Sequence, residues 1–249
     1  MQLHIYFTPT DVAAVAPTAD DIYIVIDLIR ATTSITVLLE RGAARIFVAN
    51  TLEQAQQAAE LHPGRLLCGE RNALPLPGFD YGNSPAQFSQ LDLGGRELIL
   101  TTTNGSRAFY ACPAQSVRLA GCFYNARAVT THALALARQR DCNIAIVCAA
   151  EAHYFALDDS TCAGYLALEL QRLNPALECH ESVSAATTLY ATYPPPSLGD
   201  HCRSAQSVIA VGLGADIDLC MQQNKSSIVP MVTGSEQETG LLIIERAPQ

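Results

Sequence analysis

Several common signatures are missing from this 249-residue chain. No run of even four basic residues occurs and the net charge is −9, which argues against binding nucleic acid through its phosphates. No apolar run approaches the roughly 18 residues of a membrane-spanning helix, and the N-terminal residues lack a signal-peptide pattern. We therefore expect a cytoplasmic protein with no nucleic-acid or membrane partner.

Nucleotide-binding and serine-hydrolase motifs are also missing, since no Walker loop, GxGxxG or GxSxG occurs. Cys112 and Arg118 have the C-x5-R spacing of cysteine phosphatases, but this segment follows a predicted helix and enters a predicted strand. The reverse order is needed for backbone amides to surround a phosphate. Asp216 and Asp218 resemble the paired aspartates of haloacid-dehalogenase phosphatases, but they lie in a late helical stretch. Both motifs are therefore set aside.

The cysteines form no metal-binding or disulfide pattern. They are nine in number, an odd total without a CxxC pair, which excludes a zinc knuckle and a secreted disulfide framework. We expect buried free thiols in a reducing compartment. The positions are 68, 112, 122, 142, 148, 162, 179, 202 and 220.

Apolar runs alternate with helical patterns along most of the chain, in which 49% of residues are hydrophobic and 16% charged. The β-branched run 22–26 is typical of a strand buried on both faces. Thr51 and Gln54 have the spacing of a capping box. Strands are predicted at 3–7, 22–26, 45–49, 66–68, 97–101, 117–120, 144–149, 228–231 and 241–245, and helices at 30–41, 51–62, from 84, after 104, 125–140 and 159–173. This alternation predicts a three-layer α/β/α fold with a largely parallel or mixed sheet.

Beyond residue 177 the pattern becomes rich in helices, predicted at 182–193, 205–211 and 216–224 around the prolines 194–196. Residues 174–182 are the candidate boundary between two lobes of what we expect to be a single domain spanning 1–249.

The stretch 68–85 is the most unusual one, because its glycines and prolines disfavour a regular helix or an interior strand. It carries Glu70, Arg71 and Asp80 directly after a predicted buried strand. A rigid loop with opposite charges at a strand end is a common place for a site in an α/β protein. An ordinary surface loop with solvated charges remains the alternative.

Polar clusters follow four predicted strands, and the carboxyl ends of parallel strands meet at one edge of a sheet. The clusters are Asp27 with Arg30 and Thr32–Ser34; Glu70, Arg71, Asp80 and Asn83; Thr101–Asn104, Ser106 and Arg107; and Asp158 with Asp159. Carboxylates, arginines and helix-start amides together suit a phosphate bridged to Mg²⁺. Each element also has a structural alternative: Asp27 and Asp158–Asp159 as helix caps, the threonines as turn residues, and Arg107 as a solvated charge.

Four segments together resemble the 2-phosphosulfolactate phosphatase (ComB) family. They are 27–33 (DLIRATT), 69–71 (GER), 77–85 (PGFDYGNSP) and 101–105 (TTTNG), and the tail at 228–230 is similar too. Two departures stand out: Asn72 and Ala73 where we expect glycines, and Asp158–Asp159 where Glu-Asp is commoner.

The resemblance implies a fold particular to ComB-like proteins and Mg²⁺-dependent hydrolysis of 2-phosphosulfolactate to 3-sulfolactate and phosphate, a step of coenzyme M biosynthesis. A phosphatase for another small acidic phosphoester and a non-catalytic protein that binds an anionic metabolite are the alternatives. A homodimer is expected. The expected metal ligands are Asp27, Glu70 and Asp80; the expected catalytic residues are Asp27, Arg30, Arg71, Asn104, Asp158 and Asp159; and the expected substrate-binding residues are Thr32, Thr33, Asn83, Thr102, Thr103, Gly105, Ser106 and Arg107. Asp27 as nucleophile and a metal-activated water both remain open.

Overall fold

The structure is a computed structural model that describes residues 1–15 and 17–248. The strands are β1 Gln2–Tyr6, β2 Ile22–Ile26, β3 Arg45–Ala49, β4 Leu66–Arg71, β5 Leu74–Pro75, β6 Glu97–Thr101, β7 Val117–Ala120, β8 Ile144–Cys148, β9 Glu178–Cys179, β10 Pro230–Ser235 and β11 Leu242–Arg246. The helices are α1 Pro9–Ala14, α2 Ala31–Glu40, α3 Leu52–Leu61, α4 Pro85–Phe88, α5 Gly105–Ala111, α6 Ala126–Arg140, α7 Leu157–Leu173, α8 Glu181–Thr192, α9 Leu198–His201, α10 Arg203–Ala210 and α11 Gly214–Cys220. The predicted α/β alternation and the helix-rich C-terminal part are confirmed.

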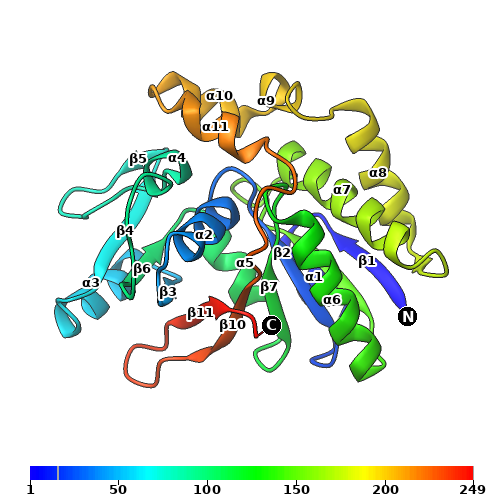
Figure 1. Cartoon of the computed structure of the whole chain (residues 1–249), viewed down its shortest axis with the longest axis horizontal. Helices are drawn as coiled ribbons and strands as arrows, with labels where there is room; N and C mark the ends of the chain where they lie inside the picture. The colour runs from blue at the N-terminus through cyan, green and yellow to red at the C-terminus, as the bar shows by residue number, and fades with distance from the viewer. Residues whose placement is uncertain (16, 249) are drawn as a thin grey trace.

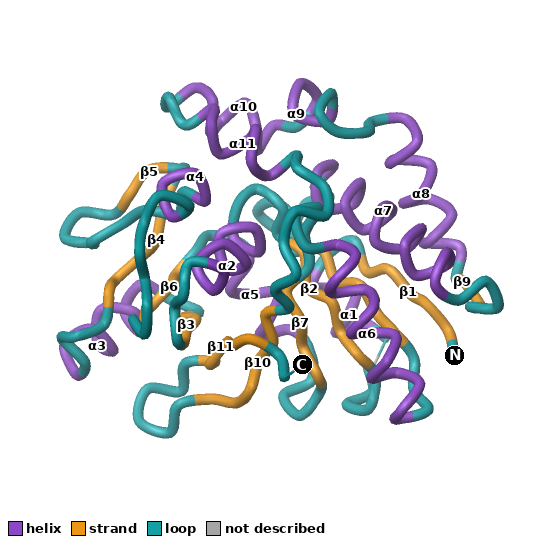
Figure 2. The backbone as a smooth tube through the Cα atoms, in the orientation of Figure 1, coloured by secondary structure: helices purple, strands orange, loops and turns teal. Residues whose placement is uncertain are grey.

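One mixed sheet contains all these strands, in the order β5-β4-β6-β3-β11-β10-β7-β2-β8-β1-β9. Two parallel groups, β4-β6-β3 and β7-β2-β8-β1-β9, are joined by the antiparallel hairpin β10–β11. Figure 2 shows the two groups on either side of α2, with the hairpin below. The last two strands of the chain thus join the two halves of the sheet.

Helices cover both faces of this sheet, which gives the three-layer α/β/α arrangement (Figure 1). Alternate residues of β2 show the two sides: Ile24 packs into a core with α6, α7 and α8, whereas Val25 packs into a core with α1, α2 and α5. On the β3–β6 side, Phe47 and Ile99 pack beneath α3. Every residue of β2 is buried, as its β-branched run predicts.

The strand β4 is longer than predicted, because it continues from the expected end at Cys68 to Arg71 and then folds back as β5. The predicted loop at 69–71 is therefore wrong. Gly69 explains the extension, since a Cβ there would lie 2.6 Å from the carbonyl oxygen of Thr101. Only glycine lets β4 run this close beside β6.

One of the two predicted helix caps is present in the structure. Thr51 and Gln54 form the predicted capping box of α3. Asn125 precedes α6 as predicted, but its side chain does not cap the helix; it accepts from the Cys122 amide (3.0 Å) and donates to the Ile228 carbonyl (3.0 Å). It ties α6 to the C-terminal segment instead.

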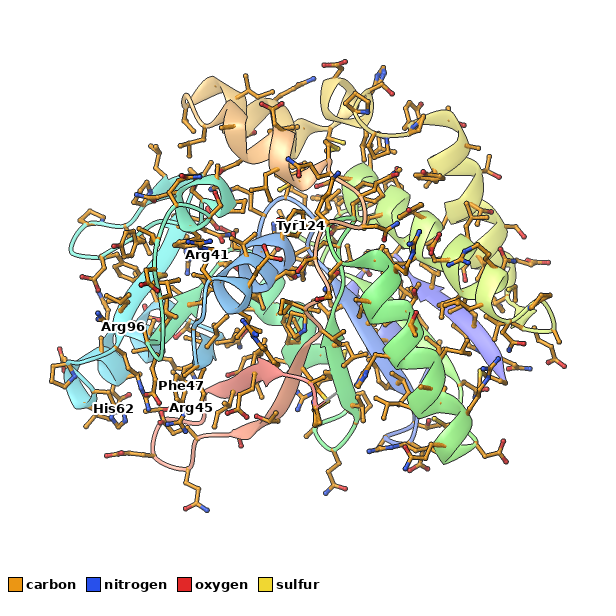
Figure 3. All side chains as sticks on the ribbon, in the orientation of Figure 1. Arg41, Arg45, Phe47, His62, Arg96 and Tyr124 are labelled. Atoms are coloured by element: carbon orange, nitrogen blue, oxygen red, sulfur yellow. The ribbon has the colours of Figure 1, made fainter. Side chains whose placement is uncertain are left out.

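A surface network holds the β10–β11 hairpin to the β3–β6 side of the sheet. The guanidinium of Arg65 stacks 3.5 Å from the centre of the Phe47 ring and donates to Glu97 (2.9 Å) and Glu236 (2.7 Å). Arg45 also lies over Phe47. Figure 3 shows Arg45, Phe47 and His62 at the same corner of the molecule. These charged side chains therefore stabilise the packing of the hairpin against the sheet.

The helices α10 and α11 lie across the top of the molecule in Figure 1, beyond the strand ends. Within the described residues, no helix combines the length and the apolar character that crossing a membrane requires.

Candidate active site

A cavity of about 370 Å³ opens where strand ends of both parallel groups meet. This volume is at the lower end of the range for small-molecule sites, about 300–1,000 Å³. The cavity is lined by Asp27, Ile29, Arg30, Glu70, Asn72, Ala73, Asn83, Thr102, Thr103, Asn104, Ala150, Glu151, Ala152, Ala156, Asp158, Asp159, Arg203, Ser204, Ser207 and Val208. All four sequence clusters contribute to this lining. The first supplies Asp27 and Arg30, the second Glu70 and Asn83, the third Thr102–Asn104, and the fourth Asp158 and Asp159.

Asp27 follows the last residue of β2 and points its carboxylate at the starts of two helices. Its Oδ1 accepts from the amide of Ala31 (3.2 Å), the first residue of α2. A Cβ on Gly105 would lie 2.7 Å from Oδ2, so a glycine is required where α5 begins. Burial raises the pKa of Asp27 to about 7, and the charges of Asp158 and Glu70 add to the rise.

Asp158 and Asp159 lie in the first turn of α7, where a helix dipole favours negative charge. Asp159 fastens two strand ends, because its oxygens accept from the amides of Leu28 (2.8 Å) and Ala150 (3.1 Å). Burial raises the pKa of Asp159 well above its usual value. Burial also raises the pKa of Asp158 to about 6, against the lowering effect of the Ser204 hydroxyl, which donates to Oδ2 (2.9 Å).

Glu70 holds the β4–β5 turn against the end of β6. Its Oε1 accepts from the amide (3.0 Å) and hydroxyl (2.8 Å) of Thr103, and its Oε2 accepts from the amide of Ala73 (3.1 Å). Asn72 and Ala73, which replace the expected glycines, have φ of 54° and 66°. Glycine adopts a left-handed backbone without strain, so these φ values agree with the glycines that the resemblance led us to expect.

Arg30 is buried and already paired. Its Nη1 lies 2.7 Å from Oδ2 of Asp216, and its Nη2 donates to the carbonyl of Ala73 (2.8 Å). Asp216 in turn accepts from the hydroxyl of Ser84 (2.5 Å) and the amide of Ala86 (3.1 Å). The guanidinium therefore has a fixed orientation at the cavity wall.

The cavity has more acidic than basic side chains. Among the described residues, five carboxylates (Asp27, Glu70, Glu151, Asp158 and Asp159) and two arginines (Arg30 and Arg203) line it. Like charges in a buried space disfavour ionisation, which agrees with the raised pKa values. A cation bound here would relieve this repulsion and provide the positive charge that an anionic ligand needs.

Asn83 is the clearest unused polar group in this cavity. It is 3% exposed, and within the described part of the chain its Oδ1 finds no hydrogen-bond donor. A buried amide oxygen without a partner is costly unless a ligand, ion or water binds it.

The family assignment agrees with this geometry. A family model described as 2-phosphosulpholactate phosphatase matches residues 6–235. The chain belongs to this family. Three relatives, each named a probable 2-phosphosulfolactate phosphatase, come from Deinococcus radiodurans (38% identity over 89% of this chain and 92% of the relative), Thermus thermophilus (36%, 91% and 93%) and Parasynechococcus marenigrum (32%, 97% and 99%). The resemblance drawn from the four segments is thereby confirmed.

Several site residues expected from the family's motifs lie behind the cavity wall. The hydroxyls of Thr32 and Thr33 donate to the carbonyls of Asp27 (2.8 Å) and Leu28 (2.9 Å), and Ser106 donates its amide to Thr102 (3.2 Å). These residues shape the turns that carry the lining residues.

Three charged residues expected at this family's site lie outside the lining. The exposed Asp80 accepts from the amide of Leu67 (2.8 Å), and Arg71 donates to the carbonyl of Glu70 (2.7 Å). Arg107 contacts Nε2 of His153 (2.7 Å) and donates to Oδ1 of Asn104 (2.8 Å). The structure does not bring these three charges to the cavity.

Sequence reasoning missed three other contributors. The loop 150–152 follows β8, and its residues Ala150 and Ala152 have φ of 64° and 47°. Arg203, Ser204 and Ser207 come from α10, which no motif distinguished. Asp216 was visible in the sequence as half of a discarded motif; its role is to hold Arg30.

The C-x5-R segment does not form a phosphatase site in the structure. Cys112 follows the last residue of α5, and burial raises its pKa to about 12, so the thiol stays protonated at neutral pH. Arg118 donates to the carbonyls of Phe109 (3.1 Å) and Ala114 (3.0 Å) rather than to any thiolate.

Proposed function

We propose that this protein is a Mg²⁺-dependent phosphatase that hydrolyses 2-phosphosulfolactate to 3-sulfolactate and phosphate. The family membership and the names of the relatives support the reaction. The observation that carries the metal dependence is the excess of buried carboxylates around Asp27, facing a cavity that must accept a highly negative substrate. The same proposal includes a role in coenzyme M biosynthesis, a cytoplasmic location and a homodimer.

The residues present fit a magnesium ion. Among the described residues, no three His, Cys, Asp or Glu side chains are grouped as a complete metal site. Mg²⁺ does not need one, because it usually keeps several waters and binds through one or two carboxylates plus substrate phosphate. We assign Asp27 and Glu70 as carboxylate ligands, with the unpaired Oδ1 of Asn83 as a further oxygen. Asp80 is not in this proposed set, because it does not line the cavity.

Bound Mg²⁺ would offset negative charge and polarise the phosphoryl oxygens. Arg30, fixed by Asp216, would stabilise charge on the transferred phosphoryl group through hydrogen bonds that need no reorganisation. Asp158, with its pKa raised to about 6, is suited to proton transfer near neutral pH. Asp27 would be either the nucleophile or a ligand that orients the attacking water.

The test is phosphate release from 2-phosphosulfolactate and a panel of small phosphomonoesters, in Mg²⁺ and in EDTA. We expect metal-dependent release that is fastest with 2-phosphosulfolactate. Glu70→Gln should lower kcat strongly, whereas Arg138→Gln, an exposed change on α6, should not.

Other outcomes distinguish the alternatives. Faster release from another ester would keep the chemistry and change the substrate. Thermal stabilisation by these esters without any release would show a binding protein. A phosphoaspartate trapped on Asp27 would identify the nucleophile, and full activity of Asp27→Asn would remove Asp27 from both roles.

A further inference from the structure

The proposed substrate has more anionic groups than the transferred phosphate, namely a carboxylate and a sulfonate. The inference below rests on the proposed function and concerns how these two groups are bound. Arg30 is not the partner proposed for them, because Asp216 and the Ala73 carbonyl fix its guanidinium and its remaining donors are assigned to the transferred phosphoryl group. Arg107, the residue expected from the sequence, lies outside the lining on Asn104 and His153.

Arg203 is the other arginine of the lining, and its side chain is 86% exposed. Among the described residues, its ionic partner is Glu151, whose Oε1 lies 3.9 Å from Nε of Arg203. This distance is too long for a strong hydrogen bond. An arginine in this state keeps most of its five donors available, and its planar fork matches carboxylate and sulfonate oxygens.

The helix α10 presents one face to the cavity, and three of its four lining residues are polar. Arg203, Ser204, Ser207 and Val208 all line it, and their spacing places them on one side of the helix. The hydroxyl of Ser204 donates to Asp158 (2.9 Å) and so fixes the start of α10 beside the acidic cluster. The backbone of Arg203 is therefore held beside the acidic cluster, while its side chain is exposed at the cavity.

We infer that Arg203 is the specificity-determining residue that binds the substrate's carboxylate or sulfonate. The Ser207 hydroxyl donates to the backbone carbonyl of Arg203 (3.0 Å) and helps to fix the residue in place. The protein would thus select phosphoesters that carry a second anionic group. Glu151 occupies Arg203 weakly in the free protein and is displaced by the stronger anion.

The experiment compares Arg203→Gln, Arg203→Lys and the distant control Arg138→Gln on two substrates in Mg²⁺. One is 2-phosphosulfolactate; the other is p-nitrophenyl phosphate, which has no second anionic group. Losing a charge-assisted hydrogen-bonded pair should raise KM for 2-phosphosulfolactate about tenfold to a hundredfold in Arg203→Gln. Arg203→Lys should recover part of this loss. The kinetics with p-nitrophenyl phosphate should not change in any variant.

Equal effects on both substrates, or none on either, would overturn the inference while leaving the phosphatase proposal intact. Calorimetric titration with 3-sulfolactate supplies a readout that needs no turnover. If the wild type releases no phosphate at all, Arg203-dependent binding of 3-sulfolactate would still support the inference. Binding that is unchanged in Arg203→Gln would reject it.

Discussion

Replacing Asp27 by asparagine should make the protein more stable at neutral pH while abolishing its proposed activity. The carboxylate of Asp27 is buried beside Asp158 and Glu70, and its pKa rises from 3.8 to about 7. At about 1.36 kcal/mol per pKa unit, ionising this group in the folded chain costs about 4 kcal/mol. Asparagine keeps an oxygen to accept from the Ala31 amide but carries no charge.

The gain should depend on pH in a defined direction. Near pH 4 the folded chain keeps Asp27 protonated, and the unfolded chain ionises it only partly, so the cost is small. As pH rises from about 4 to about 7, the unfolded chain loses its proton first, and wild-type stability falls by up to about 4 kcal/mol. Asp27→Asn should lack this component. Its advantage should therefore grow with pH and level off above about pH 7.

Urea unfolding in EDTA near pH 4 and pH 8 measures this difference. Asp218→Asn, an exposed aspartate of α11, is the matched control and should stay within about 0.5 kcal/mol of wild type. Part of the gain is repulsion shared with Asp158, so the gains of an Asp27–Asp158 double variant should not add. Mg²⁺ should stabilise wild type more than Asp27→Asn. A variant that is less stable than wild type at pH 8 would refute the reasoning.

Three further predictions concern a buried ion pair, a left-handed backbone position and a close contact between two helices. Asp216→Leu should lower the free energy of unfolding by about 3–5 kcal/mol, because it leaves Arg30 buried without its carboxylate partner. Adding Arg30→Met to this variant should recover part of the loss. If the losses of the two single variants simply add in urea unfolding, the pairing is contradicted. Ala73→Gly should raise the free energy of unfolding by about 0.5–1 kcal/mol because φ there is 66°, whereas Ala59→Gly inside α3 should lower it by about 1 kcal/mol. Gly164→Ala should lower the free energy of unfolding by about 1–3 kcal/mol, because the new Cβ would lie 2.0 Å from the carbonyl oxygen of Ala186 in α8. A variant with a higher melting temperature than the wild type would exclude that contact.

Residues that follow strands were the predictable part of the site. Asp27 and Thr102 directly follow β2 and β6, and Asp158 lies in the first turn of α7, the helix that follows β8. The local pattern and the parallel-sheet rule together predicted that these residues meet. The same rule predicted Asp80 and Arg71 beside these residues. Neither lines the cavity, and β4 continues past Cys68 and turns back as β5. An apolar run of three residues does not reveal where a strand ends.

The part of the site contributed by α10 and α11 could not be predicted, because it depends on contacts between residues that lie far apart in the sequence. Arg30 and Asp216 are 186 residues apart, and Ser204 reaches Asp158 from 46 residues away. Nothing local to Asp216 distinguishes it from a solvated helix residue until Arg30 lies opposite it. The two helices thus add to the strand-end carboxylates what those carboxylates lack: a fixed orientation for one arginine and a second arginine free to bind a ligand. An acidic sheet edge becomes a site for an acidic substrate only when these helices cover it.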